Sequence, residues 1–129
     1  MSTPDFSSPA DLPTPFGYSH VVGLPAGRLV WTSGQVAVDT AGEVPEGWEA
    51  QTRLVFESLG RALAAQGAGW DDVVKLTYYV TSVDALETVR SVRDEFVDTD
   101  APPTSSLVQV AGLIRPDLLV EVEAVAWLP

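Results

Sequence analysis

Apolar and polar residues alternate in five segments of the chain, a pattern typical of half-buried β-strands. The clearest segment is residues 73–81, where β-branched and aromatic side chains predominate. The others are residues 20–24, 28–33, 106–111 and 118–127. Because Pro25-Ala26-Gly27 joins the first two strands, we expect them to pair with each other as a hairpin.

A glycine follows the second of these strands, within Thr32-Ser33-Gly34-Gln35. Glycine inside a strand pattern usually marks a bulge, or a place where another group approaches the backbone closely. We therefore expect one of these two features at Gly34.

Two further segments repeat apolar residues every three or four positions, which predicts helices over residues 48–66 and 84–97. Gly67 follows the first helix, where glycine is favoured as a terminating residue. Ser82 is placed to cap the second helix. The apolar stripe of the second helix consists of Leu86, Val89, Val92 or Arg93, and Phe96.

The order strand, strand, helix, strand, helix, strand, strand predicts an α+β fold, with both helices on one face of a single sheet. Residues 1–15 are rich in Pro, Ser, Thr and Asp, so we expect them to be a tail that is either loose or extended against the body. The folded domain is then expected to comprise residues 16–129.

The face of the sheet away from the helices is expected to mix polar and apolar residues. Such a face is too apolar for water and too polar for a dry core, so packing against copies of the chain is the natural solution. We therefore predict a homo-oligomer with wet clefts between subunits. The residues assigned to this face are Lys75, Thr77, Tyr79, Leu107, Gln109, Glu121, Glu123, Val125 and Trp127.

Composition excludes several kinds of site. The 129 residues contain no cysteine and one histidine, His20, which excludes disulfides, thiolate metal sites and a multi-histidine site within one chain. The net charge of −11 and the absence of a basic cluster argue against binding to nucleic acid or to anionic membranes. With neither a membrane-spanning run nor a signal-peptide pattern in the sequence, we expect a cytoplasmic protein.

The stretch from Ala101 to Ala111 reads Ala-Pro-Pro-Thr-Ser-Ser-Leu-Val-Gln-Val-Ala. Its two prolines hold the chain extended and exclude a helix interior. A rigid polar loop is thus joined to the start of a strand, which is a favourable place to hold a small polar ligand. The alternative is an ordinary junction between a loop and a strand.

Taken together, these motifs resemble those of the RidA family, also known as YjgF and as L-PSP endoribonuclease. The matching residues span almost the whole chain, from about residue 16 to residue 126. They are Tyr18-Ser19, Thr32-Ser33-Gly34-Gln35, Glu49-Ala50-Gln51-Thr52, Asp72-Val73-Val74-Lys75, Pro103 to Ala111, and Glu121-Val122-Glu123-Ala124-Val125-Ala126.

The resemblance implies a chorismate-mutase-like fold and a homotrimer with three sites between its subunits. It also implies hydrolysis of reactive 2-enamine and 2-imine acids to 2-keto acids and ammonia, without metal or cofactor. Glu121 is then the expected catalytic residue, which holds or activates a water molecule. The expected substrate-binding residues are Tyr18, Gly34, Ser105 and Leu107.

One residue departs from the family pattern. The family loop reads Pro-X-Arg-Ser, and its arginine grips the substrate carboxylate, but Ser105 occupies that position here. A serine hydroxyl replaces neither the charge nor the two-pronged geometry of a guanidinium. Arg90, on the second predicted helix, and Arg115, before the last strand, are the candidate replacement cations; surface ion pairs are the alternative for both.

Three functions are therefore compatible with the sequence. They are an imine deaminase with an altered substrate range, a different hydrolase that needs no arginine clamp, and a non-catalytic trimer that binds a small molecule. For Glu121 the alternative is a solvated or ion-paired carboxylate on a wet strand face, with Lys75 as a candidate partner. Ribonuclease activity is opposed by the acidic charge balance.

Overall fold

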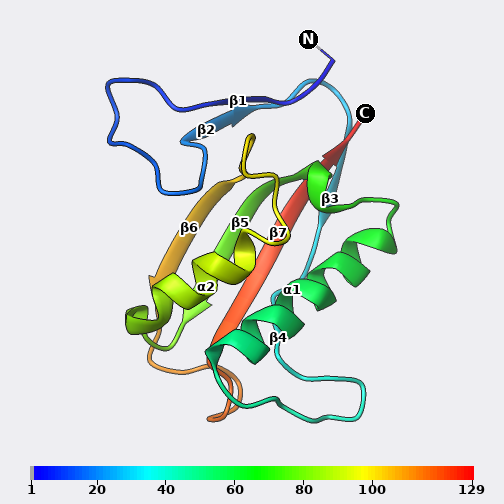
Figure 1. The fold of residues 1–129 in the computed structure, drawn as a ribbon. Coiled ribbons are helices and arrows are strands. Elements are labelled where there is room, and N and C mark those ends of the chain that lie inside the picture. Colours follow the sequence, from blue (N-terminus) through cyan, green and yellow to red (C-terminus); the bar gives the residue numbers. More distant parts are fainter. Residues whose placement is uncertain (1) are drawn as a thin grey trace.

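The computed structural model describes residues 2–129 and shows a sheet with two helices on one of its faces (Figure 1). This arrangement confirms the predicted α+β class. The strands are β1 (Asp5–Ser7), β2 (Val21–Gly23), β3 (Arg28–Trp31), β4 (Gln35–Val36), β5 (Val73–Val80), β6 (Thr104–Gln109) and β7 (Val120–Leu128). The helices are α1 (Trp48–Ala64) and α2 (Leu86–Arg93), with short 3-10 turns at Trp70–Asp72 and Val83–Ala85.

The main sheet has the strand order β3-β7-β5-β6, and β4 also pairs with β7. Strand β7 is antiparallel to β3, β4 and β5. Strand β6 is parallel to β5, because α2 carries the chain back along the helical face before β6 begins. As a result, β6 is an edge strand that lies close to α2.

The predicted irregularity at Gly34 is a bulge. Trp31 pairs with Val125 and Gln35 pairs with Val122, so residues 32–34 lie opposite only residues 123–124 of β7. The extra residue ends β3, and pairing with β7 resumes in β4.

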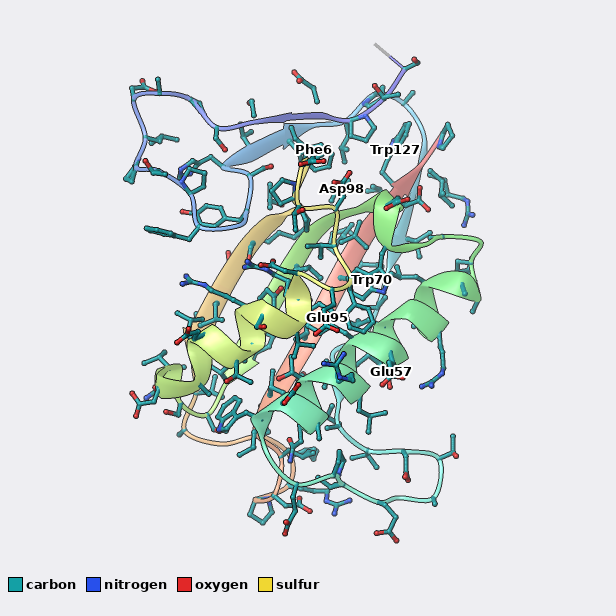
Figure 2. The ribbon with its side chains drawn as sticks, viewed as in Figure 1. Phe6, Glu57, Trp70, Glu95, Asp98 and Trp127 are labelled. Atoms are coloured by element: carbon teal, nitrogen blue, oxygen red, sulfur yellow. The ribbon has the colours of Figure 1, made fainter. Side chains whose placement is uncertain are left out.

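The core lies between the sheet and the helices, as the alternation of β5 and β7 predicts. Four alternate residues of β7 face α1 and are at most 1% exposed: Val120, Val122, Ala124 and Ala126. On the α1 side, Phe56 stacks on Trp70 (labelled in Figure 2) with ring centroids 5.1 Å apart, so the turn before β5 packs against the core. Gly67 has a φ of 77° and ends the first helix, as expected.

The predicted hairpin is wrong. Strand β2 pairs with β1, whereas β3 pairs with β7. The turn at Pro25-Ala26-Gly27 covers the Trp127 indole instead, and the indole N–H donates to the Pro25 carbonyl at 3.1 Å. A side chain at Gly27 would collide with the ring of Trp127, which Figure 2 labels, so the glycine serves close packing here. Trp127 is therefore buried by its own chain.

The second helix and β6 also differ from the expectation. Ser82 caps the 3-10 turn that leads into α2, accepting a hydrogen bond from the Asp84 N–H at 3.1 Å, and α2 itself is shorter than the pattern predicted. Leu107 pairs with Tyr78 and Gln109 with Val80, so both β6 residues face the helices and not the open face. The sequence of β6 has polar and apolar residues in both phases of its alternation, which is why the pattern did not fix the face.

In the part of the chain that the structure describes, no helix is long and apolar enough to span a bilayer.

Candidate functional site

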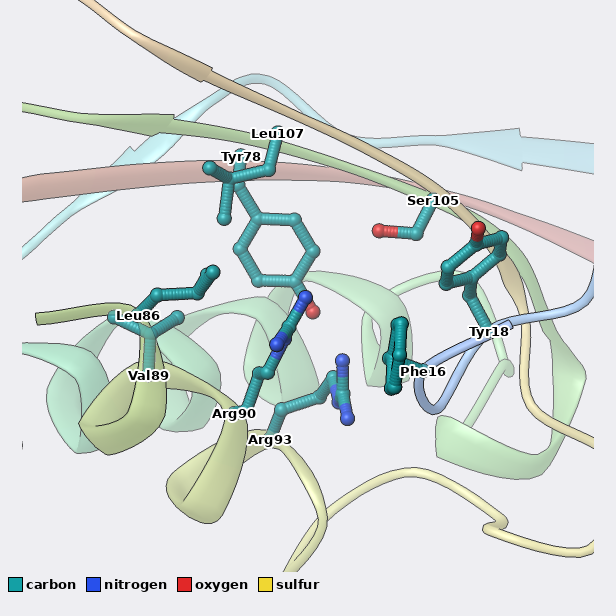
Figure 3. A pocket seen from close by; sticks show the side chains of 9 residues that line it. All are labelled: Phe16, Tyr18, Tyr78, Leu86, Val89, Arg90, Arg93, Ser105 and Leu107. Carbon is teal, nitrogen blue, oxygen red and sulfur yellow. The ribbon is translucent and has the colours of Figure 1, made fainter. Parts of the chain in front are cut away.

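A cavity of about 330 Å³ lies between β6, α2 and the segment before β2 (Figure 3). Four of the residues proposed from the sequence line it: Tyr18, Arg90, Ser105 and Leu107. They come from three separate parts of the chain, so the fold is what brings them together. The cavity lies on the helical side of the sheet, at its β6 edge.

Ser105 and Leu107 reach the cavity because of the register between β5 and β6. Leu76 pairs with Ser105 and Tyr78 with Leu107, which turns both β6 side chains toward α2. The loop before β6 is fixed, since the Ser19 N–H donates to the Pro103 carbonyl at 3.1 Å. The same contact holds the neighbouring Tyr18 at the rim.

Helix α2 contributes two guanidinium groups to the cavity, from Arg90 and Arg93. Arg93 is only 7% exposed and pairs with Asp94, with a nitrogen-to-oxygen distance of 2.9 Å. Its guanidinium packs against Gly17, where a Cβ would collide with it. The Arg90 guanidinium carbon lies 5.8 Å from the centroid of the Phe16 ring, a cation–π contact. No carboxylate of residues 2–129 lies within ion-pair distance of Arg90.

The Tyr78 ring extends from β5 toward these arginines (Figure 3). The side chain is 2% exposed, and its hydroxyl has no hydrogen-bond partner among the described residues. Burial raises the pKa of Tyr78, so the phenol stays protonated at neutral pH. It remains a hydrogen-bond donor that nothing within residues 2–129 satisfies.

Glu121 and Gly34 lie together, but on the other face of the sheet. A Cβ at Gly34 would collide with the Glu121 carboxylate, so the glycine allows the carboxylate to lie against the backbone. Lys75 donates to Ser106 at 2.9 Å, and among residues 2–129 it forms no ion pair with Glu121. The neighbouring Glu123 accepts a hydrogen bond from the Tyr79 hydroxyl at 2.7 Å, which raises the pKa of Tyr79.

The candidate residues therefore form two groups on opposite faces of one sheet. Glu121 pairs with Tyr79 on the open face, whereas Ser105 pairs with Leu76, which faces the helices. A single chain does not bring the Glu121 carboxylate to the Ser105 hydroxyl. The two groups can meet only if one copy presents its open face to the β6 edge of another.

The remaining candidates lie elsewhere. Arg115 forms an ion pair with Asp117 at 2.8 Å in the loop before β7 and does not line the cavity. His20, the one histidine of the sequence, does not line the cavity; its Nε2 lies 2.7 Å from the Pro13 carbonyl oxygen. Among residues 2–129, no cluster of three or more histidine, aspartate or glutamate side chains is arranged to hold a metal ion.

Sequence reasoning did not assign five residues to the cavity: Phe16, Tyr78, Leu86, Val89 and Arg93. A signal for Arg93 was present, because it lies three residues after Arg90 and seven after Leu86, on the apolar stripe of α2. An arginine on an inward stripe is unusual unless it has a partner or a ligand. The role of Tyr78 could not be read from its position in an apolar strand.

Comparison with known proteins finds similarity in both sequence and structure. The family model described as endoribonuclease L-PSP matches residues 10–128. The 2-iminobutanoate/2-iminopropanoate deaminase of Salmonella typhimurium LT2 is 36% identical over 110 residues, covering 83% of this chain and 85% of the relative.

Two solved structures are similar along nearly their whole length. YyfB of Yersinia pestis, described as a conserved Rid family protein, is 34% identical with a TM-score of 0.86, covering 98% of this chain and 99% of that one. TdcF of Escherichia coli, solved with bound serine, is 32% identical with a TM-score of 0.74, covering 95% and 94%.

Proposed function

Because the chain belongs to the endoribonuclease L-PSP family, also called the RidA family, we propose that it is a hydrolytic deaminase of reactive 2-imino and 2-enamino acids. The reaction adds water to a C=N bond and yields a 2-keto acid and ammonia. The similarity to a relative named as a 2-iminobutanoate/2-iminopropanoate deaminase supports this reaction class. The cavity at the β6 edge supports a small-molecule substrate.

The proposal includes a homotrimer with its sites between subunits. The open face supports packing between copies, because Leu29, Trp31 and Val108 are 50%, 69% and 47% exposed there. Three such side chains on one sheet face favour burial against another copy over contact with water. In this assembly, Glu121 and Gly34 of one subunit complete the cavity of its neighbour.

In the proposed reaction the Glu121 carboxylate accepts a proton from water as the water oxygen bonds to the imine carbon. The π electrons of the C=N bond move to nitrogen, which takes the proton back from Glu121 to give a neutral tetrahedral carbinolamine. Glu121 then accepts the proton of the carbinolamine hydroxyl and passes it to nitrogen. As the carbonyl forms, the C–N bond breaks and its electron pair leaves on ammonia. In this proposal the hydroxyls of Tyr18 and Ser105, two residues that line the cavity, hydrogen-bond the substrate.

One observation carries this proposal: Tyr18, Ser105 and Leu107, named from the family resemblance alone, line one cavity. The test is release of ammonia from 2-iminopropanoate that an amino-acid oxidase generates in situ. We expect ammonia to form faster than the imine hydrolyses in buffer. A rate equal to that of buffer, from protein whose oligomeric state is intact, would refute the proposal.

Ser105 favours a second candidate, a trimer that binds a small molecule without converting it. The hydroxyl can bind a polar group but supplies no charge to stabilise an anionic substrate. Saturable binding of metabolites with no turnover of acidic or neutral imines would favour this candidate.

A further inference from the structure

The cavity at the β6 edge is positively charged within an acidic protein. The chain has 7 lysine and arginine residues against 18 aspartate and glutamate residues, yet two arginines, Arg90 and Arg93, line this one cavity. Within the described residues, no carboxylate lines it. Two guanidinium groups in a partly enclosed, partly apolar space attract an anion more strongly than they would at the surface.

The two arginines differ in how much charge they can offer. Arg93 is buried and already paired with Asp94, so its charge is partly neutralised. Arg90 is half-buried and pairs with no carboxylate of residues 2–129, and its guanidinium lies over the Phe16 ring. A cation–π contact stabilises a guanidinium but does not use its N–H groups as hydrogen-bond donors. These groups remain available to donate in the plane of the guanidinium.

An independent observation at the same place also points to a ligand. The Tyr78 hydroxyl is buried, faces the arginines and has no partner among the described residues (Figure 3). A buried donor without an acceptor is unfavourable, and such groups are rare in proteins. An acceptor bound between Tyr78 and Arg90 would satisfy it.

We propose that Arg90, Arg93 and the Tyr78 hydroxyl form an anion subsite that binds the substrate carboxylate from the α2 side of the cavity. The carboxylate then lies across the cavity from Ser105, at the opposite wall from the β6 position where the family arginine is expected. The apolar side chains of Leu86, Val89 and Leu107 line the same space and favour acids with an aliphatic side chain. The substrate class is thus a 2-imino acid with an aliphatic side chain; this step rests on the proposed function.

The test measures binding and needs no turnover. Calorimetry compares 2-oxobutanoate, the stable keto-acid product expected from 2-iminobutanoate, with its neutral amide. For the wild-type protein we expect the acid to bind more tightly than the amide. In Arg90→Gln, affinity for the acid should fall by about 10- to 100-fold, because a charge-assisted hydrogen bond is lost, while affinity for the amide changes little.

Two further variants make the result specific. Arg61→Gln removes the same charge from an exposed position on α1, so it should bind the acid like the wild type. Arg90→Lys keeps the charge but loses the planar fork, and it should bind the acid more weakly than the wild type and more tightly than Arg90→Gln.

Unchanged binding of the acid by Arg90→Gln would overturn the subsite, and so would equal losses in Arg90→Gln and Arg61→Gln. The two proposals can fail separately. If the acid binds through Arg90 but no imine releases ammonia, the subsite stands and the deaminase proposal fails. If ammonia is released and Arg90→Gln has an unchanged KM for acidic imines, the deaminase stands and the subsite fails.

Discussion

Replacing Tyr78 by phenylalanine removes one oxygen atom and leaves the ring in place. Removing a tyrosine hydroxyl from a protein interior usually destabilises the fold, because a hydrogen bond is lost. Here the hydroxyl is buried and has no partner within residues 2–129, so the opposite sign is expected. Tyr78→Phe should make the ligand-free protein more stable.

The size of the effect follows from the cost of an unsatisfied buried group. Leaving a buried hydroxyl unpaired costs about 1–3 kcal/mol, and the loss of packing around one oxygen atom offsets part of the gain. We expect a net gain of about 1 kcal/mol in the free energy of unfolding, near the lower end of that range. In urea this raises the midpoint by roughly 0.3–1 M, since chains of this size have slopes of about 1–3 kcal/mol per M.

Tyr79→Phe is the matched control, because it removes the same atom from the next residue of β5. Tyr79 donates to Glu123 at 2.7 Å, so this variant should be less stable than the wild type. Both variants are compared with the wild type at equal protomer concentration, since oligomerisation contributes to stability. With saturating 2-oxobutanoate, the wild type should gain more stability than Tyr78→Phe, because only the wild type retains the hydroxyl donor.

A loss of stability in ligand-free Tyr78→Phe would refute this reasoning. It would mean that the hydroxyl already has a partner in solution and is not available to a ligand. Equal stabilisation of the wild type and Tyr78→Phe by the acid would remove Tyr78 from the anion subsite.

Glu121→Gln should lower kcat for imine hydrolysis by about 100- to 10,000-fold without unfolding the protein, which steady-state assays and circular dichroism will show; an unchanged kcat would exclude Glu121 as the base. Gly34→Ala should displace the Glu121 carboxylate and reduce kcat more than KM, because a Cβ has no room there; wild-type kinetics would contradict the close contact. Glu123→Gln should lower the pKa of Tyr79, seen as earlier tyrosinate absorbance in an alkaline titration; an unchanged titration would show that the Glu123 contact does not set it. Because the folded pKa of Tyr79 is raised above its unfolded value near ~10, this contribution to stability is fully present below pH ~10 and is lost as pH rises through the folded pKa.

The architecture could be predicted where one face of an element is clearly apolar. In β7, Val120, Val122, Ala124 and Ala126 alternate with Glu121 and Glu123, so the buried face follows from the sequence. The same holds for the stripe of α1 that contains Val55 and Leu59. These elements form the centre of the fold, which is why its class was correct.

Pairing was mispredicted where local signals compete with contacts far along the chain. The Pro25-Ala26-Gly27 turn looks like a hairpin connection, but Trp127, about a hundred residues later, packs under it. Residues 5–7 have no apolar periodicity, yet they pair with β2. A tail sequence carries no information about such a partner.

The candidate site was likewise predicted in part, and the rest of it depends on contacts between distant parts of the chain. The family resemblance indicated Tyr18, Ser105 and Leu107, and the fold places them in one cavity. The alternation of β7 indicated that Glu121 lies on the open face, but the sequence did not show that Ser105 and Leu107 lie on the other face, because this depends on the register of β5 with β6. Nor could it identify Tyr78 and Arg93, whose roles depend on how closely α2 approaches the sheet.

The central claim is that each site combines the cavity of one copy with the Glu121 carboxylate of another. The most direct measurement is complementation between Glu121→Gln and Ser105→Phe, the second of which fills the cavity. Each variant alone should release little ammonia. Co-expressed copies that assemble at random should recover about one quarter of wild-type activity, since a site is complete only when an intact cavity meets an intact carboxylate. Mixed oligomers with no more activity than the two parent variants would contradict a site shared between copies.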